Sequence, residues 1–187
     1  MTFLARCGVA LSVGIVVVRV AVGEPVPANN GPLHTRGPSH ADVAIDAQVL
    51  LERTNEGDAR AAWLLGTRFA SGRAGVRDDS EALRWFRRAA DLGLPQAQYN
   101  IGIMYANGQG VPKDWVQASR WFENAAEQGL AQAQFNIGTL HSQGKGVALE
   151  DARAVHWLGR AAPSGLAAAQ FNLAVLYEHG VGVGRNA

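Results

Sequence analysis

The sequence predicts an all-α fold, a solenoid of antiparallel helix pairs built from units of 36 residues. Glycine recurs at this spacing at Gly57, Gly93, Gly129 and Gly165. Other residue types keep the same phase without an insertion, among them Ala61, Ala97, Ala133 and Ala169, and Trp85, Trp121 and Trp157. A fixed period of this length indicates a repeat array, in which each unit buries its apolar face by stacking on a neighbour. No part of the chain has the alternating pattern of a strand.

Composition places the chain among globular proteins and argues against nucleic acid as a partner. The 187 residues are 48% hydrophobic and carry a formal net charge of +1. Removal of an N-terminal segment containing Arg6 and Arg19 would leave 17 − 2 = 15 basic side chains against 16 acidic ones, a net charge of −1. No basic stripe remains to follow a phosphate backbone. The only cysteine, Cys7, lies in the same segment, so the processed chain can form no internal disulfide.

Residues 1–23 are predicted to be a signal peptide. Arg6 precedes an apolar run from Val9 to Val18, and Ala21-Val22-Gly23 offers small residues for a cleavage site. The run is shorter than the about 20 residues that span a bilayer, and a second arginine follows it. Export to the periplasm or the medium is therefore expected, with an uncleaved membrane anchor as the alternative.

Residues 24–40 are predicted to form a flexible linker. Prolines break any helix here, and the accompanying asparagines and glycines leave little to bury. The prolines are Pro25, Pro27, Pro32 and Pro38. His34 and His40 also lie in this segment, where solvated side chains are favoured over a metal site.

Residues 41–56 are predicted to form a helix that caps the array. Apolar residues recur in it at helical spacing. Val49-Leu50 lies one period before Trp85-Phe86, so this helix corresponds to the second helix of a degenerate preceding unit. It is expected to cover the apolar side of the first full unit.

Full units are expected at 57–92, 93–128 and 129–164, followed by a partial unit at 165–187. Each full unit holds two helices separated by a glycine-rich turn. In the second unit the helices are predicted from Leu94 to Asn107 and from Lys113 to Gln128, with the turn at Gly108-Gln109-Gly110-Val111-Pro112.

Acidic residues and glycines mark the ends of the second helices. Asp114 places a negative charge at the helix N-terminus, and Gly129 can adopt the left-handed conformation of a C-terminal cap. The acidic equivalents in the other units are Asp78 or Asp79, and Glu150-Asp151. Gly102 and Gly138 allow neighbouring helices to approach closely. Trp121, one turn before Ala125, is expected to be buried between helices.

These positions together resemble the Sel-one-like repeat, a relative of the tetratricopeptide repeat with a slightly longer unit. The matching residues are Ala97-Gln98-Tyr99-Asn100-Ile101-Gly102, Tyr105, Gly108-Gln109-Gly110-Val111, Asp114, Ala118, Trp121-Phe122 and Ala125-Ala126. The resemblance covers roughly residues 57–182. It implies a right-handed superhelical solenoid that acts as an adaptor for other proteins. In bacteria it also implies an exported protein that serves in envelope regulation, exopolysaccharide control or host interaction.

The C-terminal end departs from the repeat pattern. Gly159 lies inside the second helix of the third unit, and Pro163 is expected to end that helix early. The fourth unit reaches Ala187 without a second helix, so Leu173 and Tyr177 are expected to be partly exposed. Residues 166–187 therefore offer a surface for self-association.

No catalytic or metal site, and no cofactor, is predicted. Gly180-Val181-Gly182-Val183-Gly184 looks like a phosphate loop, but it matches the inter-helix turns of earlier units and follows no strand. His141 replaces an aromatic residue and is interpreted as partly buried, and His156 and His179 fall at other places in the unit. The serines have no partner histidine and acid at a meaningful spacing.

A row of aromatic and asparagine side chains on the first helices is the candidate peptide-binding site. Counting about 100° per residue places it opposite the core positions of the helix, beside Gln96, Ile103, Ala106 and Asn107. The site residues are Trp63, Tyr99, Asn100, Phe135, Asn136, Phe171 and Asn172. Aromatic faces and amides suit an extended peptide in a concave groove. The alternative is that the aromatic rings fill gaps between helices and the asparagines brace the backbone.

The predicted function is an exported, non-enzymatic protein-protein interaction module that binds a peptide or an envelope partner. An envelope hydrolase is a second hypothesis, which would need an acid or nucleophile constellation that the sequence does not show. A structural or assembly role is a third, with the half-unit at the C-terminal end pairing with another copy or another repeat protein.

Overall fold

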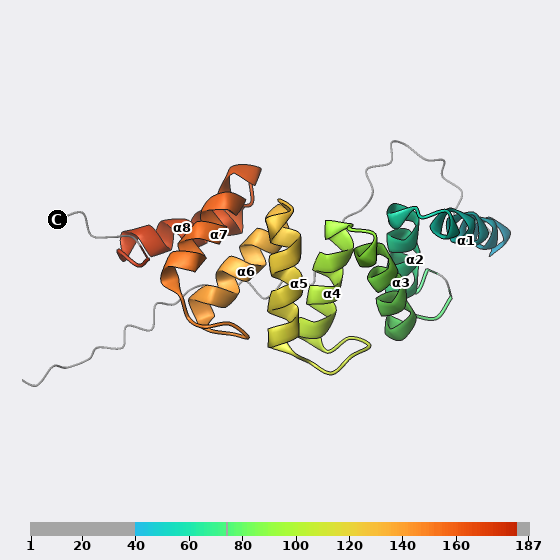
Figure 1. The fold of residues 1–187 in the computed structure, drawn as a ribbon, viewed down its shortest axis with the longest axis horizontal. Helices are drawn as coiled ribbons and strands as arrows, with labels where there is room; N and C mark the ends of the chain where they lie inside the picture. Colours follow the sequence, from blue (N-terminus) through green and yellow to red (C-terminus); the bar gives the residue numbers. More distant parts are fainter. Residues whose placement is uncertain (1–39, 74, 183–187) are drawn as a thin grey trace, which may run out of the picture.

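The computed structural model describes residues 40–73 and 75–182, which form eight α-helices and one short 3₁₀ helix and contain no strand. The helices follow one another along the long axis, from α1 (His40–Asn55) at one end to α8 (Ala167–Glu178) at the other (Figure 1). The predicted all-α solenoid is confirmed. The predicted signal peptide and the linker lie outside the described residues, except for His40, where α1 begins.

Consecutive helices pair to form the units. The pairs are α2 (Ala59–Ser71) with α3 (Asp79–Asp91), α4 (Pro95–Asn107) with α5 (Trp115–Glu127), and α6 (Ala131–Gln143) with α7 (Asp151–Ala161). Helices within a unit contact each other more extensively than helices of neighbouring units do. Helix α1 packs on α2, and α8 packs on α7. Among the described helices, α1 and α8 therefore have a contact with a neighbouring unit but none with a partner helix of their own unit.

Aspartate side chains cap the N-termini of α2, α3 and α5. Asp114 Oδ1 accepts hydrogen bonds from the backbone N–H groups of Val116 and Gln117 at 2.8 and 3.0 Å. Asp78 caps α3 in the same way, as predicted. At α7 the Glu150 side chain makes no capping hydrogen bond. A glutamate has one more methylene than aspartate, which carries its carboxylate past the first N–H groups.

A glycine in each inter-helix turn packs on the unit before it. Gly110 has a φ of 66°, and a Cβ there would lie 2.6 Å from the carbonyl oxygen of Asp79, the first residue of α3. One period later Gly146 meets Trp115 of α5, and after α8 Gly182 meets Asp151 of α7. Each turn therefore closes against the start of the preceding second helix, where a side chain has no room.

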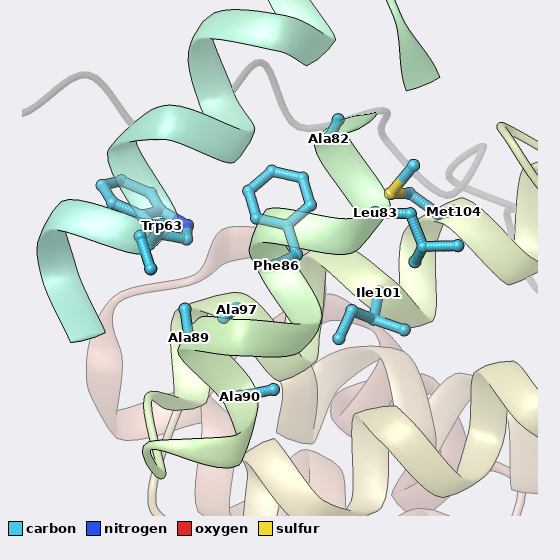
Figure 2. Packing of buried hydrophobic residues seen from close by; sticks show 10 residues of the cluster. Trp63, Ala82, Leu83, Phe86, Ala89, Ala90, Ala97, Ile101 and Met104 are labelled. Carbon is cyan, nitrogen blue, oxygen red and sulfur yellow. The ribbon is translucent and has the colours of Figure 1, made fainter. Parts of the chain in front are cut away.

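The core of each unit is built on a close approach of its two helices at a glycine. A Cβ at Gly66 would lie 2.6 Å from the ring of Phe86, and a Cβ at Gly102 would lie 2.6 Å from the ring of Phe122. In Figure 2, Phe86 lies between Trp63 on one side and the side chains of the α4 helix on the other. Phe122 is completely buried.

The expectation that Trp121 is the buried residue of the second helix is wrong. Trp121 is only partly buried, and its neighbour Phe122 fills the space opposite Gly102. Successive residues on a helix point about 100° apart, so only one of two adjacent aromatic residues can face the glycine. In the third unit Leu158 takes this place, opposite Gly138, but Trp157, the equivalent of Trp121, is buried there as expected.

The departures expected at the C-terminal end are present. Helix α7 has 11 residues, whereas α5 has 13, and η1 (Ala162–Ser164), which contains Pro163, follows it directly. On α8, Tyr177 is 52% exposed and Leu173 is half-buried, as predicted.

Candidate functional site

The aromatic residues of the predicted row differ widely in exposure. Trp63 is buried, with 8% of its surface exposed, and Tyr99 and Phe135 are half-buried. Phe171 is 51% exposed. Exposure therefore rises along the array and is greatest on the last described helix, α8.

Packing within each unit accounts for the buried rings. The ring of Tyr99 on α4 is tilted against that of Phe122 on α5, with centroids 5.7 Å apart. Burial raises the pKa of the Tyr99 hydroxyl, and the neighbouring Asn136 amide opposes that shift. Phe135 packs against the cluster that contains Leu158 of α7. In the inner units the row thus contributes to the contact between first and second helices.

A second aromatic position completes this contact. On each first helix, an aromatic residue is followed three residues later by a glycine or an alanine. Three residues after that comes a second ring. We call this triplet the aromatic cradle. The four cradles are Trp63-Gly66-Phe69, Tyr99-Gly102-Tyr105, Phe135-Gly138-His141 and Phe171-Ala174-Tyr177. Phe86, Phe122 and Leu158 fill the first three.

His141 belongs to the third cradle and is almost completely buried, rather than partly buried as expected. Its ring Nδ1 lies 3.3 Å from the carbonyl oxygen of Ala148 in the following turn. His156 is exposed and its ring lies edge-on to that of Trp157, and His179 Nδ1 lies 2.8 Å from the carbonyl oxygen of Val175. The three histidines lie in separate local environments.

The asparagines of the row are unequal as well. Asn100 is half-buried, whereas Asn136 and Asn172 are 6% and 5% exposed. The Oδ1 atom of Asn172 is buried without a hydrogen-bond partner among the described residues. Asn100 is therefore the one asparagine of the three with substantial surface for a ligand.

The side of α4 expected to be open is smaller than predicted. Gln96 and Asn107 are exposed, but Ile103 and Ala106 are buried in a cluster with residues of α5 and α6. The physical reason is that a first helix contacts its own second helix and also the next unit. Apolar residues are therefore needed on more than one side of α4.

Glutamine side chains also connect neighbouring units. Gln134 Nε2 donates to the carbonyl oxygen of Ala126 at 3.1 Å, and Gln170 Nε2 donates to that of Ala162 at the same distance. Gln98, at the same place in the second unit, does not reach the preceding unit and accepts instead from Gln128 Nε2 of its own unit at 2.7 Å. Gln98, Gln134 and Gln170 keep the repeat spacing, so this position could have been identified in the sequence as a candidate contact between helices.

Sites for other chemistry are scarce in the described residues. These residues contain no group of three or more histidine, cysteine, aspartate or glutamate side chains that could hold a metal ion. Gly180 and Gly182 have φ values of 62° and 68° and belong to the turn after α8, as the repeat register predicted. None of the described helices combines the length and apolar character needed to cross a membrane.

Comparison with known proteins identifies the repeat. The family described as Sel1 repeat matches four consecutive segments of the chain, residues 59–94, 95–130, 131–165 and 167–187. No curated protein matches the sequence.

Solved structures share both sequence and fold with the chain. One is the crystal structure of c5321, a protective antigen present in uropathogenic Escherichia coli strains that displays an SLR fold. Its sequence is 39% identical to that of this chain, and the TM-score is 0.71. The match covers 74% of this chain but only 30% of that protein. A Sel1 repeat protein from Oxalobacter formigenes is 38% identical with a TM-score of 0.65, over 69% of this chain and 97% of that one.

A more distant structure shows the fold alone. Helicobacter pylori cysteine rich protein B (hcpB) is 18% identical with a TM-score of 0.58, over 72% of this chain and 97% of that one.

Proposed function

Because the chain belongs to the Sel1 repeat family, we propose that it is an exported, non-enzymatic protein-interaction module that binds an extended segment of a partner protein. Sel1-repeat proteins are in general protein-interaction modules and scaffolds rather than enzymes. What is proposed for this chain is the location of the contact, the kind of partner and the compartment.

The observation that carries the proposal is the exposed part of the aromatic and asparagine row. Tyr99, Asn100 and Phe135 keep part of their surface open on adjacent units, and Phe171 is half open on the next. Trp63, Asn136 and Asn172 are buried and are left out of the proposed contact. The proposed contact residues are thus a subset of the row predicted from the sequence.

The chemistry of the open residues suits an extended peptide. Ring edges offer rigid apolar area at a low cost in side-chain entropy. The amide of Asn100 can both donate to and accept from a peptide backbone. Because the units repeat at a fixed spacing, successive contacts would fall at regular intervals along the bound segment.

Export follows from the N-terminal sequence pattern. A basic residue, an apolar run and small residues at a cleavage site precede Glu24 in the sequence. The proposed partner is accordingly a protein of the bacterial envelope or one encountered outside the cell. N-terminal sequencing of the exported protein is expected to begin near Glu24, and a membrane-bound form that still begins at Met1 or Thr2 would contradict this.

The binding test uses two asparagines in different surroundings. The purified exported protein captures partners from an envelope extract, and the captured partner is then titrated against the wild type, Asn100→Ala and Asn124→Ala. Asn124 is exposed on the second helix α5 and serves as the matched control. We expect Asn100→Ala to weaken binding about tenfold, or about 1.4 kcal/mol, and Asn124→Ala to leave it unchanged. Equal affinities of the two variants would overturn the proposed surface.

A further inference from the structure

The glycine turns meet the second helices at three equivalent joints, and the middle joint differs from the other two. At each joint a turn glycine closes on the first residue of the preceding second helix. These first residues are Asp79 in α3, Trp115 in α5 and Asp151 in α7. A tryptophan therefore stands at the middle joint where the other joints have an acidic residue.

Two lysine side chains converge on this tryptophan. Lys113 Nζ lies 4.9 Å from the centre of the Trp115 ring, and Lys145 Nζ lies 5.6 Å from it. Lys113 belongs to the turn before α5, whereas Lys145 belongs to the turn after α6, which extends to the start of α5 (Figure 1). The chain has no other lysine. Both of its lysines thus lie at one joint, which we call the lysine joint (Lys113, Trp115 and Lys145).

No carboxylate neutralises the lysine joint. Among the described residues, no ion pair joins either lysine to an aspartate or a glutamate. Asp114 caps α5 instead, and the first turn of that helix has no acidic side chain. At the first joint, by contrast, Arg77 pairs with Asp79 at 2.8 Å. The lysine joint therefore carries two positive charges without a negative partner.

The repeat does not require this arrangement. The first and third joints close with the same backbone contact and do not have two cations. Like charges at one place repel each other, and the face of the indole ring offsets part of this repulsion. The packing of the turn therefore does not explain why both cations are present. The equivalent residues are Arg77 and Leu149 for Lys113, and Gln109 and Val181 for Lys145.

We propose that the lysine joint binds an acidic segment of a partner protein, whose carboxylates contact the two ammonium groups. That the partner is a protein rests on the proposed function. Both lysines are exposed, and the ring holds their ammonium groups in place, so less side-chain entropy is lost on binding. Alternate residues of an extended segment lie on one side about 7 Å apart. Two acidic residues with this spacing can reach two ammonium groups over a single ring.

The surroundings of the lysine joint favour a protein over a polyanion. Val116 follows the tryptophan and lies beside the turn that carries Lys145, and Leu149 belongs to that same turn. Both apolar side chains are exposed. A protein segment can cover them while its carboxylates contact the lysines. Nucleic acid needs a longer series of cations to follow its phosphates.

The lysine joint is separate from the Asn100 surface. Asn100 lies near the middle of α4, whereas the lysine joint lies beyond the C-terminal end of that helix, about 10 Å away along its axis. Substitutions at one place therefore leave the other intact. The two contacts can be tested independently.

The binding test uses the exported protein and two fluorescein-labelled peptides, in which glycine alternates with glutamate or, as the neutral probe, with glutamine. Fluorescence polarisation gives the affinity of the wild type and of the lysine variant, Lys113→Gln with Lys145→Gln. The matched control is Arg120→Gln with Arg160→Gln. It removes the same charge from exposed side chains, and Arg160 likewise lies over a tryptophan ring, that of Trp157.

We expect the lysine variant to bind the glutamate peptide at least tenfold more weakly than the wild type, with unchanged helical circular dichroism. The control should bind as the wild type does, and the glutamine peptide should not bind. Raising the salt concentration about tenfold should weaken binding, because exposed charges are screened. Equal affinities of wild type and lysine variant, equal affinities for the two peptides, or no binding at millimolar peptide would overturn the proposal. So would polygalacturonate that binds through the lysines when the glutamate peptide does not.

Chemical modification separates the charge of the lysines from their shape. Acetylation removes the charge, whereas reductive dimethylation keeps it. Acetylation should weaken binding of the glutamate peptide at least tenfold, and dimethylation less than twofold. The lysine variant, treated in the same way, controls for modification of the α-amino group. Equal losses from the two reagents would contradict binding through charge.

The partner captured in the test of the proposed function distinguishes the two surfaces. We expect it to bind the lysine variant at least tenfold more weakly than the wild type. A partner that loses affinity for Asn100→Ala but not for the lysine variant would overturn the lysine joint alone. The reverse result would overturn the Asn100 surface alone.

Discussion

Helices α5 and α7 hold the same place in consecutive units but are stabilised to different degrees. Helix α5 starts at the Asp114 cap, and its Phe122 is completely buried in the aromatic cradle of α4. Helix α7 has no side-chain cap, contains Gly159, and ends two residues sooner than α5 before the 3₁₀ turn. Packing at the centre of the unit is preserved in both, while the local features of the helix are lost in α7.

This difference separates two sources of stability in a repeat. Burial at the cradle depends on the neighbouring helix, whereas caps and helix propensity act within one helix. The third unit keeps the first source and has less of the second. We therefore expect variants at the cradle to have large effects in any unit and variants at helix ends to have small ones that differ between α5 and α7.

The largest effect is expected from the residue that fills the cradle. Phe122→Ala should lower the free energy of unfolding by about 3–5 kcal/mol, because a large buried ring is removed. Trp121→Ala should cost less, since the indole is already partly exposed. Urea unfolding followed by far-ultraviolet circular dichroism measures both. A larger loss from Trp121→Ala would mean that the helix is rotated from the position described.

An added methyl group at the cradle should have the next largest effect. Gly102→Ala should destabilise the protein by about 1–3 kcal/mol although alanine favours helices, because the new Cβ would meet the ring of Phe122 at 2.6 Å. The same substitution at Gly159, which has no heavy atom within 4 Å of its Cβ position, is the matched control. If both variants were stabilised, the cradle would be loosely packed.

A glycine inside the helix can be removed from α7 or introduced at the equivalent position of α5. Gly159→Ala should raise the free energy of unfolding by about 1 kcal/mol, since glycine is that much less favourable in a helix interior. Glu123→Gly, one period earlier in α5, should lower it by a similar amount. Thermal unfolding of the two variants checks the pair, and effects of the same sign would contradict it.

Capping should give the smallest effect. Glu150→Asp should add about 0.5–1 kcal/mol by giving α7 the cap that Asp114 gives α5. Asp114→Glu is the reverse exchange and should cost a comparable amount. Native-state hydrogen exchange of the first turns of α5 and α7 reports the change locally. A cap that formed at α7 without added protection there would show that this end does not limit stability.

The sequence was sufficient for the features that repeat. Its period placed the helices of the second unit within two residues of the observed bounds, and the aspartates at Asp78 and Asp114 identified real caps. The choice between Trp121 and Phe122 could not be made in this way, because adjacent residues share the same period. That choice depends on which side chain faces Gly102, and hence on the contact between two helices.

The candidate row was harder to interpret than the fold. Its members share one position in the repeat, yet Trp63 is buried and Phe171 is open. The difference arises from the neighbours of each unit rather than from the residues themselves. A pattern along the chain reports equivalence between units, and it does not report whether a second helix covers a given one.

The glycine turns have a consequence for the order of folding. Gly110 closes on the start of α3, Gly146 on the start of α5 and Gly182 on the start of α7. In each case the surface that receives the turn lies earlier in the chain. A polypeptide that emerges from the ribosome or the export channel with its N-terminal end first would therefore always present a completed docking surface to the unit that follows. When the units fold in this order, no unit has to wait for a segment that emerges later.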